Sequence, residues 1–333
     1  MIGIDVSDRS IKVAEVAAGE QSELLSVCWT SLAPGSIKRG IIQDVHQVVL
    51  GVRRAFESCS PKQVEGVEVV ASIPEMRSFV RAIELPLMSE DETDEAVHWA
   101  VRQHIPFDLD RVYLDWERLA NTGEQLDKQQ VLVGVTQRDV VDPLLMALEG
   151  ADLRVVALEL EAQAIVRSLL PLDKRGVEGV LTIDLGATST NIIYVDAGAM
   201  RYTANLQVGG DYLTNELAQT LHIQPSIAAQ KKATVGLQQS GSEQEVVEAL
   251  RSATFDLVKR IERVTREIGA QFSGGSGIRA ILLAGGAANL PGIVSIFSEV
   301  FPDIPVQLGN PLTNIVVRRN TMAAVSQEDA SHF

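Results

Sequence analysis

The chain has 333 residues, and its hydrophobic content of 46% is sufficient for two lobes with separate cores. Its formal net charge of −15 argues against a nucleic-acid-binding protein, because phosphate backbones select basic surfaces. Two cysteines are too few for a disulfide framework and lack metal-ligand spacing. Cys28 and Cys59 are therefore expected to be free, structural thiols in a reducing cytoplasm.

Three β-prone runs open the chain and predict strands at Ile2–Val6, Ile11–Val16 and Leu24–Thr30. Neither a basic nor an apolar leader precedes them, so we expect no secretory signal. No run of the sequence reaches the ~18–20 uninterrupted apolar residues of a membrane helix. These features predict a cytoplasmic protein without direct membrane insertion.

Two amphipathic helices are predicted next. Apolar residues recur at helical spacing over Val45–Phe56, and Ser89 with Glu92 forms a capping box that opens a helix to about His104. Trp99 lies in this second helix, where packing in the core or at an interface is its expected role. The surrounding patterns predict strands at Val67–Ile73, Phe79–Glu84, Tyr113–Leu119 and Val131–Thr136, and a helix at Val140–Leu148.

Leu153–Leu158 predicts a strand and Glu159–Leu170 a helix, with Pro171–Val177 as the expected hinge between the lobes. The Gly/Ser run Ser273–Gly277 predicts a loop and not a phosphate cradle, because it follows a helix. Between hinge and loop, the patterns predict strands at Gly179–Asp184, Asn191–Val195 and Arg201–Leu206, and helices starting near Gly210, Ser226 and Ser242.

Two strand–turn–strand segments, Gly3–Val13 and Leu181–Asn191, each place one Asp and several hydroxyl residues between β-prone runs. Such a turn offers backbone N–H groups and hydroxyls to phosphate, while Asp5 or Asp184 can reach a hydrated divalent cation. The alternative is that each Asp caps its own tight turn. The presence of two such segments favours a nucleotide clamp.

A third segment, Ile281–Gly292, is a buried-type strand that breaks at Gly285-Gly286 and continues into a helix. Glycines at such a break let the backbone lie against a flat ring without an intervening Cβ. The order and spacing of the three segments resemble the phosphate-1, phosphate-2 and adenosine motifs of the actin/Hsp70-type ATPase superfamily.

The segments between these motifs resemble the PilM family of type IV pilus assembly proteins, over about Met1 to Val317. The neighbourhood of Ile105-Pro106-Phe107 is the most specific part, and relatives such as FtsA share it less than the nucleotide motifs. The resemblance is carried by Ser72–Pro74, Leu85–Glu92, Gln103–Asp110, Val112–Trp116, Val131–Val135, Gln137–Val141 and Gly209–Thr214.

The resemblance implies an α/β, actin-like ATPase fold with two lobes, a nucleotide cleft between them, and a small β-rich domain inserted in the first lobe. The expected parts are residues 1–30 with 151–176 as the first subdomain, 31–150 as the insertion, 177–324 as the second lobe with a helical subdomain at about 211–273, and 325–333 as an acidic tail.

The resemblance also implies a site for ATP or ADP with Mg²⁺, in which Asp5 and Asp184 hold the ion through water. Glu161 would orient the attacking water, and Lys12 would neutralise phosphate charge. The other expected nucleotide contacts are Ser7, Ser10, Gly186, Thr188, Ser189, Gly209, Gly210, Lys232, Gly285, Gly286 and Asn289. Plain alternatives remain: a turn at Gly209-Gly210, a solvated Lys232, and an exposed helical Glu161.

The sequence departs from the family pattern where family members usually read Gly-Ser-Ser, since it has Ser7-Asp8-Arg9. A second carboxylate beside a triphosphate would cost roughly 1–4 kcal/mol at ~4 Å, although Arg9 can offset it. Ala229 replaces an acidic residue before Lys232, and Ala287 replaces the third glycine of a Gly-Gly-Gly run. These changes bear on tight binding and hydrolysis more than on the fold.

The resemblance implies a cytoplasmic ATP-binding scaffold of the pilus inner-membrane platform. Its expected partner is the amino-terminal cytoplasmic peptide of a PilN-like membrane protein, together with other platform components, through which it would be peripheral at the inner membrane. Homo-oligomer formation stays open. Alternatives are a slow ATPase whose turnover drives assembly, a nucleotide-independent pseudo-ATPase adaptor of a related secretion system, and an FtsA-like filament, which the short acidic tail disfavours.

Overall fold

The computed structural model describes residues 1–19, 22–104, 108–119, 127–171, 178–238, 243–272, 276–318 and 321. The chain forms two compact units, each described by itself. Unit 1 contains Met1–Arg175, Ala197–Thr203 and Pro311–Ala330, and unit 2 contains Gly176–Asp196, Ala204–Asn310 and Ser331–Phe333. Within the described residues, no helix combines the length and the apolar character needed to cross a bilayer.

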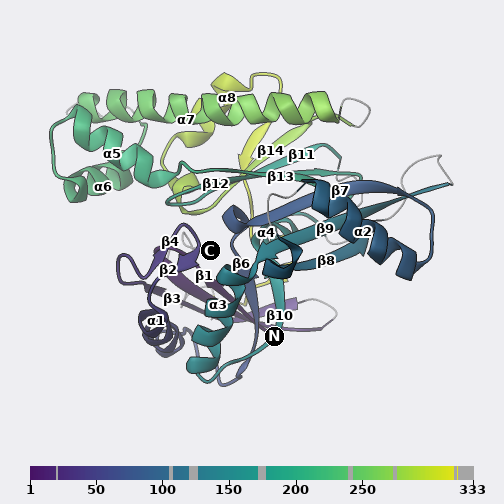
Figure 1. Cartoon of the computed structure of the whole chain (residues 1–333). Helices are drawn as coiled ribbons and strands as arrows, with labels where there is room; N and C mark the ends of the chain where they lie inside the picture. The colour runs from purple at the N-terminus through teal and green to yellow at the C-terminus, as the bar shows by residue number, and fades with distance from the viewer. Residues whose placement is uncertain are drawn as a thin grey trace. The chain divides into compact units, whose positions relative to one another are not determined.

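Unit 1 is built on a six-stranded sheet with the order β10-β6-β1-β2-β3-β16 (Figure 1). The three strands predicted at the start of the chain form its antiparallel meander, β1-β2-β3. On the other side of β1, strands β6 and β10 run parallel to it. The strands are β1 (Ile2–Val6), β2 (Ser10–Ala17), β3 (Ser22–Ser31), β6 (Glu68–Ile73), β10 (Arg154–Leu160) and β16 (Ile315–Val316).

Helices α1 (Val45–Glu57) and α3 (Arg138–Gly150) pack on this sheet and close its core. Strand β1 alternates, with Ile2 and Ile4 buried, and α1 buries Val48 at the same core. Because an alternating strand presents one apolar face, two amphipathic helices are enough to cover it. This layer places the carboxyl ends of β1, β6 and β10 side by side.

A second set of strands in unit 1 pairs antiparallel in the order β7-β9-β8, with β7 (Ser78–Pro86), β8 (Val112–Arg118) and β9 (Lys128–Gln137). Helix α2 (Glu90–His104) packs Val97 and Val101 against it. The short hairpin β4 (Ile37–Lys38) and β5 (Ile41–Ile42) lies apart from both sheets. The inserted domain expected at residues 31–150 stays a prediction. Strand β6 belongs to the six-stranded sheet and helices α1 and α3 pack on that sheet, which argues for a shorter insertion.

The predicted capping box of α2 is confirmed. The Ser89 backbone N–H donates to Glu92 Oε2 at 2.9 Å, and the Glu92 N–H lies 3.4 Å from Ser89 Oγ. The prediction that Trp99 packs in the core is wrong, because its side chain is 67% exposed on the outer face of the helix. The helical period places Thr93, Val97 and Val101 on the buried face instead. Ile105-Pro106-Phe107, expected to follow this helix, lies outside the described residues.

The prediction of two free thiols is wrong: Cys28 and Cys59 form a disulfide. The two residues are 31 positions apart, but the backbone of Val27 exchanges hydrogen bonds with that of Ser60. This isolated bridge sets the neighbouring cysteines side by side, with Cα atoms 4.2 Å apart. Spacing along the sequence contains no sign of such a tertiary pairing.

The helix predicted at Glu159–Leu170 begins later, as α4 (Glu161–Leu169), because Glu159 and Leu160 continue strand β10 and pair with Ser72 and Ile73. The expected hinge lies outside the described residues except for Pro171. The expected acidic tail and residues 273–275 of the Gly/Ser run lie outside them too.

Unit 2 contains a sheet in which β11 pairs antiparallel with β12 and parallel with β14, and β14 pairs parallel with β15. Strands β11 and β12 are buried along almost their whole length. The strands are β11 (Val180–Leu185), β12 (Thr190–Asp196), β14 (Ala280–Ala284) and β15 (Val306–Leu308).

The helices of unit 2 begin where the sequence predicts, and Figure 1 shows α5, α6 and α7 grouped together with α8 beside α7. They are α5 (Gly210–Thr220), α6 (Pro225–Thr234), α7 (Gln244–Gln271) and α8 (Ile293–Val300), with a short 3₁₀ turn at Gly286–Asn289. Strand β13 (Ala199–Leu206) begins in unit 1, where Tyr202 pairs with Arg81 of β7, and the chain enters unit 2 after Thr203.

Candidate functional site

The first group of predicted site residues lies at the carboxyl ends of β1, β6 and β10 in unit 1, and is called the unit 1 site below. These strands are parallel and adjacent, so Asp5 of β1, Ser72 of β6 and Glu161 after β10 end at the same edge. Ligands of α/β sheets characteristically bind at this edge. Ser7, Ser10 and Lys12 join the group through the β1–β2 turn.

Asp5 is held by two neighbours. Its Oδ1 accepts a hydrogen bond of 2.7 Å from the Ser72 hydroxyl, and its Oδ2 lies 3.4 Å from the Lys12 ammonium. Lys12 is the direct cross-strand neighbour of Asp5, which puts both side chains on one face of the hairpin. The side chains of both are about one-third exposed, so the pair can be reached from solvent.

The β1–β2 turn is closed by its serines. The Ser7 hydroxyl and backbone N–H both donate to the Ser10 carbonyl at 3.0 Å. The two hydroxyl oxygens of Ser7 and Ser10 lie 3.3 Å apart. This geometry gives the turn the compact form that the sequence predicts.

Asp8, the residue at which the chain departs from the family pattern, serves the backbone of another turn. Its two carboxylate oxygens accept the N–H groups of Arg39 and Gly40, each at 2.9 Å. Both donors have positive φ, 51° and 74°. Asp8 therefore stabilises the β4–β5 turn, and both oxygens of its carboxylate are engaged by backbone donors.

Glu161 is the first residue of α4, and its Oε2 lies 3.3 Å from the backbone nitrogen of Glu75. It is half-buried, not an exposed helical Glu. Glu75 follows β6 by two residues and is buried. The segment after β6 therefore connects Asp5, through Ser72, with Glu161.

The second group lies in unit 2, at the carboxyl ends of the parallel strands β11 and β14, and is called the unit 2 site below. Asp184 Oδ2 accepts a hydrogen bond of 3.1 Å from the amide of Asn191, its cross-strand partner. The Asn191 oxygen in turn accepts from the amide of Asn205 at 2.6 Å. This chain of amides orients the carboxylate of Asp184.

Close backbone approach explains three predicted glycines. A Cβ at Gly285, where φ is +82°, would collide with Asp184 Oδ1 and would lie 2.6 Å from the Leu185 carbonyl. A Cβ at Gly209 would lie 2.8 Å from the Ala187 carbonyl, and one at Gly186 would lie 2.9 Å from the Ser189 carbonyl. Side chains at these positions would therefore push the turn apart.

The Gly186–Ser189 turn is tied to the start of α5. Gly210 N donates to the Gly186 carbonyl at 2.9 Å, and Asp211 N donates to the Ala187 carbonyl at 2.8 Å. The same turn contains Thr188 and Ser189, and Gly186 N donates to the Ser189 carbonyl at 2.9 Å. The predicted Gly209-Gly210 segment therefore lies directly against the predicted phosphate turn.

Lys232 reaches this point from α6, since its ammonium donates to the Gly210 carbonyl at 2.8 Å. Burial lowers the pKa of Lys232, and the charge of Asp211 opposes that shift. A freely solvated surface lysine does not have these contacts. Gly286 and Asn289 lie on the 3₁₀ turn after β14, next to Ala287, whose Cβ would lie 3.2 Å from a Cβ at Gly210.

The structure thus brings the predicted residues together in two groups, one in each unit. Among the described residues, no set of three or more His, Cys, Asp or Glu side chains could hold a metal ion directly. One carboxylate in each group fits a Mg²⁺ ion that keeps its waters and takes its remaining ligands from phosphate. The donor set would not fit a cation that needs a cage of protein oxygens.

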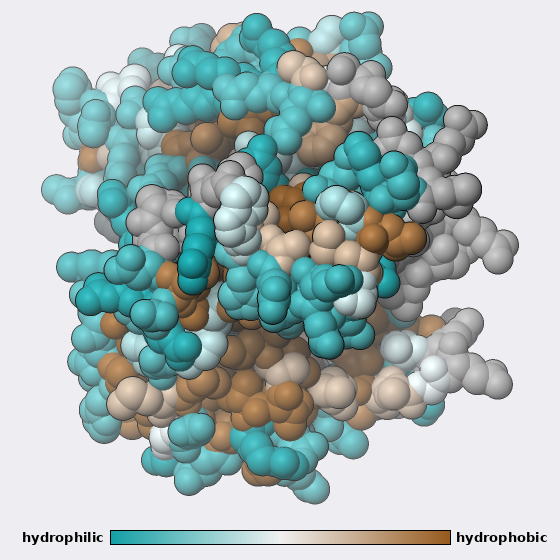
Figure 2. All heavy atoms as spheres, turned by 45° about the vertical axis from the view of Figure 1, so that its right-hand side comes forward, coloured by the Kyte–Doolittle hydropathy of each residue, from teal (hydrophilic) through white to brown (hydrophobic). Residues whose placement is uncertain are grey.

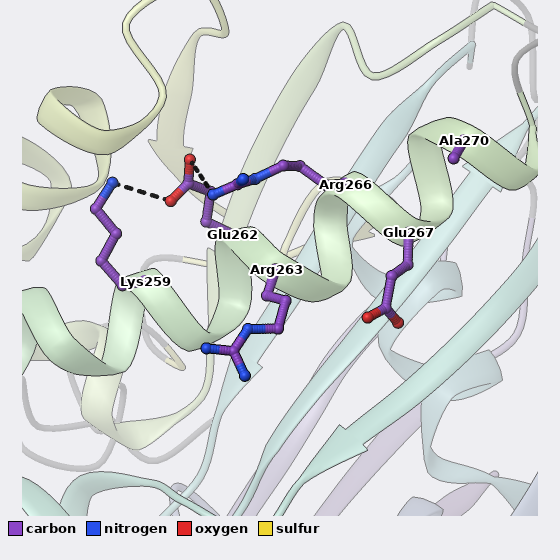
Figure 3. A pocket seen from close by; sticks show the side chains of 6 residues that line it. All are labelled: Lys259, Glu262, Arg263, Arg266, Glu267 and Ala270. Atoms are coloured by element: carbon purple, nitrogen blue, oxygen red, sulfur yellow. Dashed lines mark hydrogen bonds and ion pairs between the residues drawn. The ribbon is translucent and has the colours of Figure 1, made fainter.

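Separate hollows lie on unit 2 and contain none of the predicted residues. One, of about 580 Å³, runs along α7 (Figure 3). Its charges compensate one another, because Glu262 pairs with Lys259 at 2.9 Å and with Arg266 at 3.1 Å. It is lined by Lys259, Glu262, Arg263, Arg266, Glu267 and Ala270.

Several residues of the two sites have no role in the sequence interpretation. Ser72 lies within a family segment and Asn191 ends the second Asp-bearing motif, but the sequence predicts no function for either residue. Their contacts depend on register, Asn191 against Asp184 and β6 against β1. No local pattern indicates Glu75 or Asn205, whose partners come from distant segments.

Comparisons with known proteins bear on the fold and the family of the chain. The chain is 24% identical to the cell division protein FtsA of Enterococcus hirae over 367 aligned positions, covering 95% of this chain and 81% of the relative. Among solved structures, MreB5 of Spiroplasma citri bound to AMPPNP superposes with a TM-score of 0.53 at 13% identity, covering 92% and 90% of the two chains. These likenesses show the actin-like ATPase fold.

A stronger structural match is the chain from a PilM-PilN type IV pilus biogenesis complex, with a TM-score of 0.81 and 22% identity, covering 95% of this chain and 90% of that one. The family model described as type IV pilus assembly protein PilM matches residues 3–333. Because that match spans nearly the whole sequence, the chain belongs to the PilM family of type IV pilus assembly proteins.

Proposed function

We propose that this PilM-family scaffold binds Mg-ATP through the unit 1 and unit 2 sites. The observation that carries the proposal is the repetition of one arrangement in both units. Each has an Asp at the carboxyl end of a strand, oriented by a neighbouring polar side chain and followed by a tight turn with hydroxyl residues. Two such turns suit a polyphosphate with its hydrated cation.

In the proposed complex, Asp5 and Asp184 hold waters of the Mg²⁺ ion. Lys12 and the hydroxyl turns Ser7–Ser10 and Thr188–Ser189 contact the phosphates. The adenosine lies against Gly285-Gly286 and Asn289, with Lys232 nearby. MreB5 of Spiroplasma citri has been solved with AMPPNP and with ADP, at TM-scores of 0.53 and 0.52 to this chain, which supports a nucleotide as the ligand class.

Calorimetric titration of the nucleotide-stripped protein with Mg-ATP tests this proposal. We expect Asp184→Ala and Asp5→Ala each to weaken binding by about tenfold or more, because each removes a charged ligand. Asp303→Ala is the matched control, since Asp303 is an exposed carboxylate of unit 2 beyond α8. Absence of binding by the wild-type protein would contradict the proposal and favour a pseudo-ATPase adaptor.

We also propose that the chain binds the amino-terminal cytoplasmic peptide of a PilN-like membrane protein. One edge of the unit 1 sheet supports this, because β10 is the terminal strand of the described sheet. Val156 is bulged between the paired residues Val155 and Ala157, and its side chain is 45% exposed. An extended peptide could add its backbone to this edge and place an apolar side chain against Val156.

The face drawn in Figure 2 agrees with an apolar docking region on unit 1. Hydrophobic residues gather in a broad band across its lower half, at the level of the unit 1 sheet in Figure 1. Patches of this kind commonly mark protein contacts.

The chain would then be cytoplasmic and reach the inner membrane through its partners, where other platform components would join it.

Fluorescence anisotropy with a labelled synthetic PilN-like peptide tests the docking edge. We expect Val156→Lys to weaken binding by about tenfold, because a charge replaces an apolar anchor. Met146→Lys is the control, since Met146 is a 61% exposed residue of α3 and is not on the edge strand. Equal binding by both variants would place the peptide elsewhere.

A further inference from the structure

Helix α4 lacks a cap of its own. The residue at its N-cap position is Leu160, which has no side-chain oxygen to accept the first N–H groups of the helix. The backbone N–H of Ala162, the second residue of the helix, instead donates to the carboxyl group of Glu75, which comes from the segment after β6. A residue about 86 positions away along the chain thus caps the helix that begins with Glu161.

The contact between the two segments is reciprocal. The Glu75 side chain accepts from the Ala162 backbone, and the Glu75 backbone N–H lies 3.3 Å from the Glu161 carboxylate. The same Glu75 carboxyl accepts a hydrogen bond from the Thr203 side chain at the end of the unit 1 part of β13. Glu75 therefore fixes both the backbone and the side chain at the start of α4.

Burial of the Glu75 carboxyl group costs free energy of desolvation. Glu75 is 2% exposed, and its Oε2 has no hydrogen-bond partner among the residues that the structure describes. Burial raises the pKa of Glu75 to about 7, against the hydrogen bonds from Thr203 and Ala162, which lower it. An apolar side chain would avoid this desolvation but would leave the Ala162 N–H without its acceptor, so the hydrogen bonds that the carboxyl group accepts account for its presence here.

The segment is also anchored at its other end. Arg77 Nε donates to the Arg39 carbonyl at 2.9 Å, and the N–H of Arg39 donates to Asp8 in the β1–β2 turn. A Cβ at Gly40 would lie 3.1 Å from the Pro74 side chain. Pro74–Arg77 is thus held between the turn that contains Ser7 and the start of α4, which restricts where Glu161 can lie.

We propose that Glu75 is a positioning residue for Glu161, holding its carboxylate at the edge of the unit 1 site so that it can orient the water that attacks ATP. The inference rests on the proposed nucleotide function. Glu75 acts through Glu161 and its helix, and it does not itself touch the nucleotide. Because Gln can accept the same hydrogen bonds, the amide variant should keep the arrangement and the alanine variant should lose it.

Amide hydrogen exchange of the nucleotide-free protein tests the positioning itself. We expect Glu75→Ala to accelerate exchange at Ala162 by about tenfold and Glu75→Gln to leave it within about twofold. Glu68→Ala is the control, because Glu68 is exposed and lies at the opposite end of β6 from Glu75. Unchanged exchange at Ala162 in Glu75→Ala would overturn the proposal whether or not the protein binds ATP.

Steady-state hydrolysis of Mg-ATP tests the consequence. We expect Glu75→Ala to lower kcat by about tenfold with an unchanged KM, and Glu75→Gln to restore kcat, since only the orientation of Glu161 is altered. A wild-type protein that binds Mg-ATP without hydrolysing it, or equal kcat in Glu75→Ala, would overturn the role. Loss of ATP binding by the wild-type chain would instead contradict the proposed function, leaving the exchange result to decide the contact.

Discussion

The Ser72 hydroxyl donates a hydrogen bond of 2.7 Å to Oδ1 of Asp5, across the boundary between two parallel strands. Lys12 occupies the other oxygen at 3.4 Å, so the carboxylate is oriented from both sides. A residue that binds a hydrated cation through one oxygen needs such an orientation. Ser72 is therefore part of the unit 1 site, although it would not touch the ligand.

Replacing Ser72 with Ala should weaken Mg-ATP binding by about tenfold, the equivalent of about 1.5 kcal/mol for one lost hydrogen bond to a charged group. Calorimetry at fixed salt measures the difference. Ser168→Ala is the control, because the Ser168 hydroxyl donates to a carbonyl within its own helix at 2.9 Å. If both variants bind like the wild type, Asp5 does not depend on Ser72.

Stability should depend on pH through Glu75. Its pKa is raised by burial from 4.5 to about 7, so between these values the folded chain holds a proton that the unfolded chain has released. The free energy of unfolding should therefore fall by about 3 kcal/mol as pH rises from about 4.5 to about 7, and then level off. Below about pH 4.5 both the folded and the unfolded chain hold this proton, so the free energy of unfolding keeps its full value with respect to Glu75.

Urea denaturation of wild type and Glu75→Gln from about pH 5 to about pH 8 measures this effect, because the amide has no proton to release. The difference in unfolding free energy between the two proteins should grow with pH in favour of the variant. Glu57→Gln, at an exposed position of α1, should follow the wild type. Parallel profiles for all three proteins would show that Glu75 does not titrate in this range.

The disulfide between Cys28 and Cys59 should stabilise unit 1. It closes a segment of 31 positions, for which the loss of unfolded-state freedom gives about 4 kcal/mol. Cys59→Ser should lower the free energy of unfolding by about that amount without reductant, and have little effect when the wild type is reduced. Alkylation of both thiols in freshly isolated native protein would show that the bond is open in the cell.

Gly285→Ala should damage the unit 2 site, whereas Gly269→Ala, on α7 and outside that site, should not. The first would strain a backbone at φ +82° and drive a methyl group into Asp184, while the second meets nothing within 4 Å. We expect Gly285→Ala to cost about 1–3 kcal/mol of stability and to weaken Mg-ATP binding by about tenfold. Thermal unfolding and calorimetry on both variants check this, and equal behaviour would refute the close approach.

Local patterns predicted most of the fold. The alternation of Ile2 and Ile4, the helical spacing of Val48 and Val52, and the Ser89–Glu92 capping box each depend on residues a few positions apart. The prediction of free thiols failed because the disulfide depends on the bridge between Val27 and Ser60, which only the folded chain creates. Signals between residues a few positions apart can be found in the sequence, whereas contacts between distant segments cannot.

The sites divide in the same way. Asp5 and Asp184 could be proposed as site residues because each belongs to a compact motif, and the glycines beside them because each lies in a turn of such a motif. Glu75 could not, since a carboxyl group between Pro74 and Met76 has the pattern of an ordinary surface turn. Trp99 shows the converse error: a large aromatic residue suggests burial, but the period of α2 turns it outward.

The carboxylate of Asp8 bears on how related sequences are sorted into active and inactive members. A serine-to-aspartate change in a phosphate turn suggests a lost ligand site when only the linear motif is compared. Here both oxygens of that aspartate accept backbone donors at Arg39 and Gly40, so the charge is used within the protein. A relative with Asp at this place should be judged by whether it also keeps the positive-φ turn that receives it.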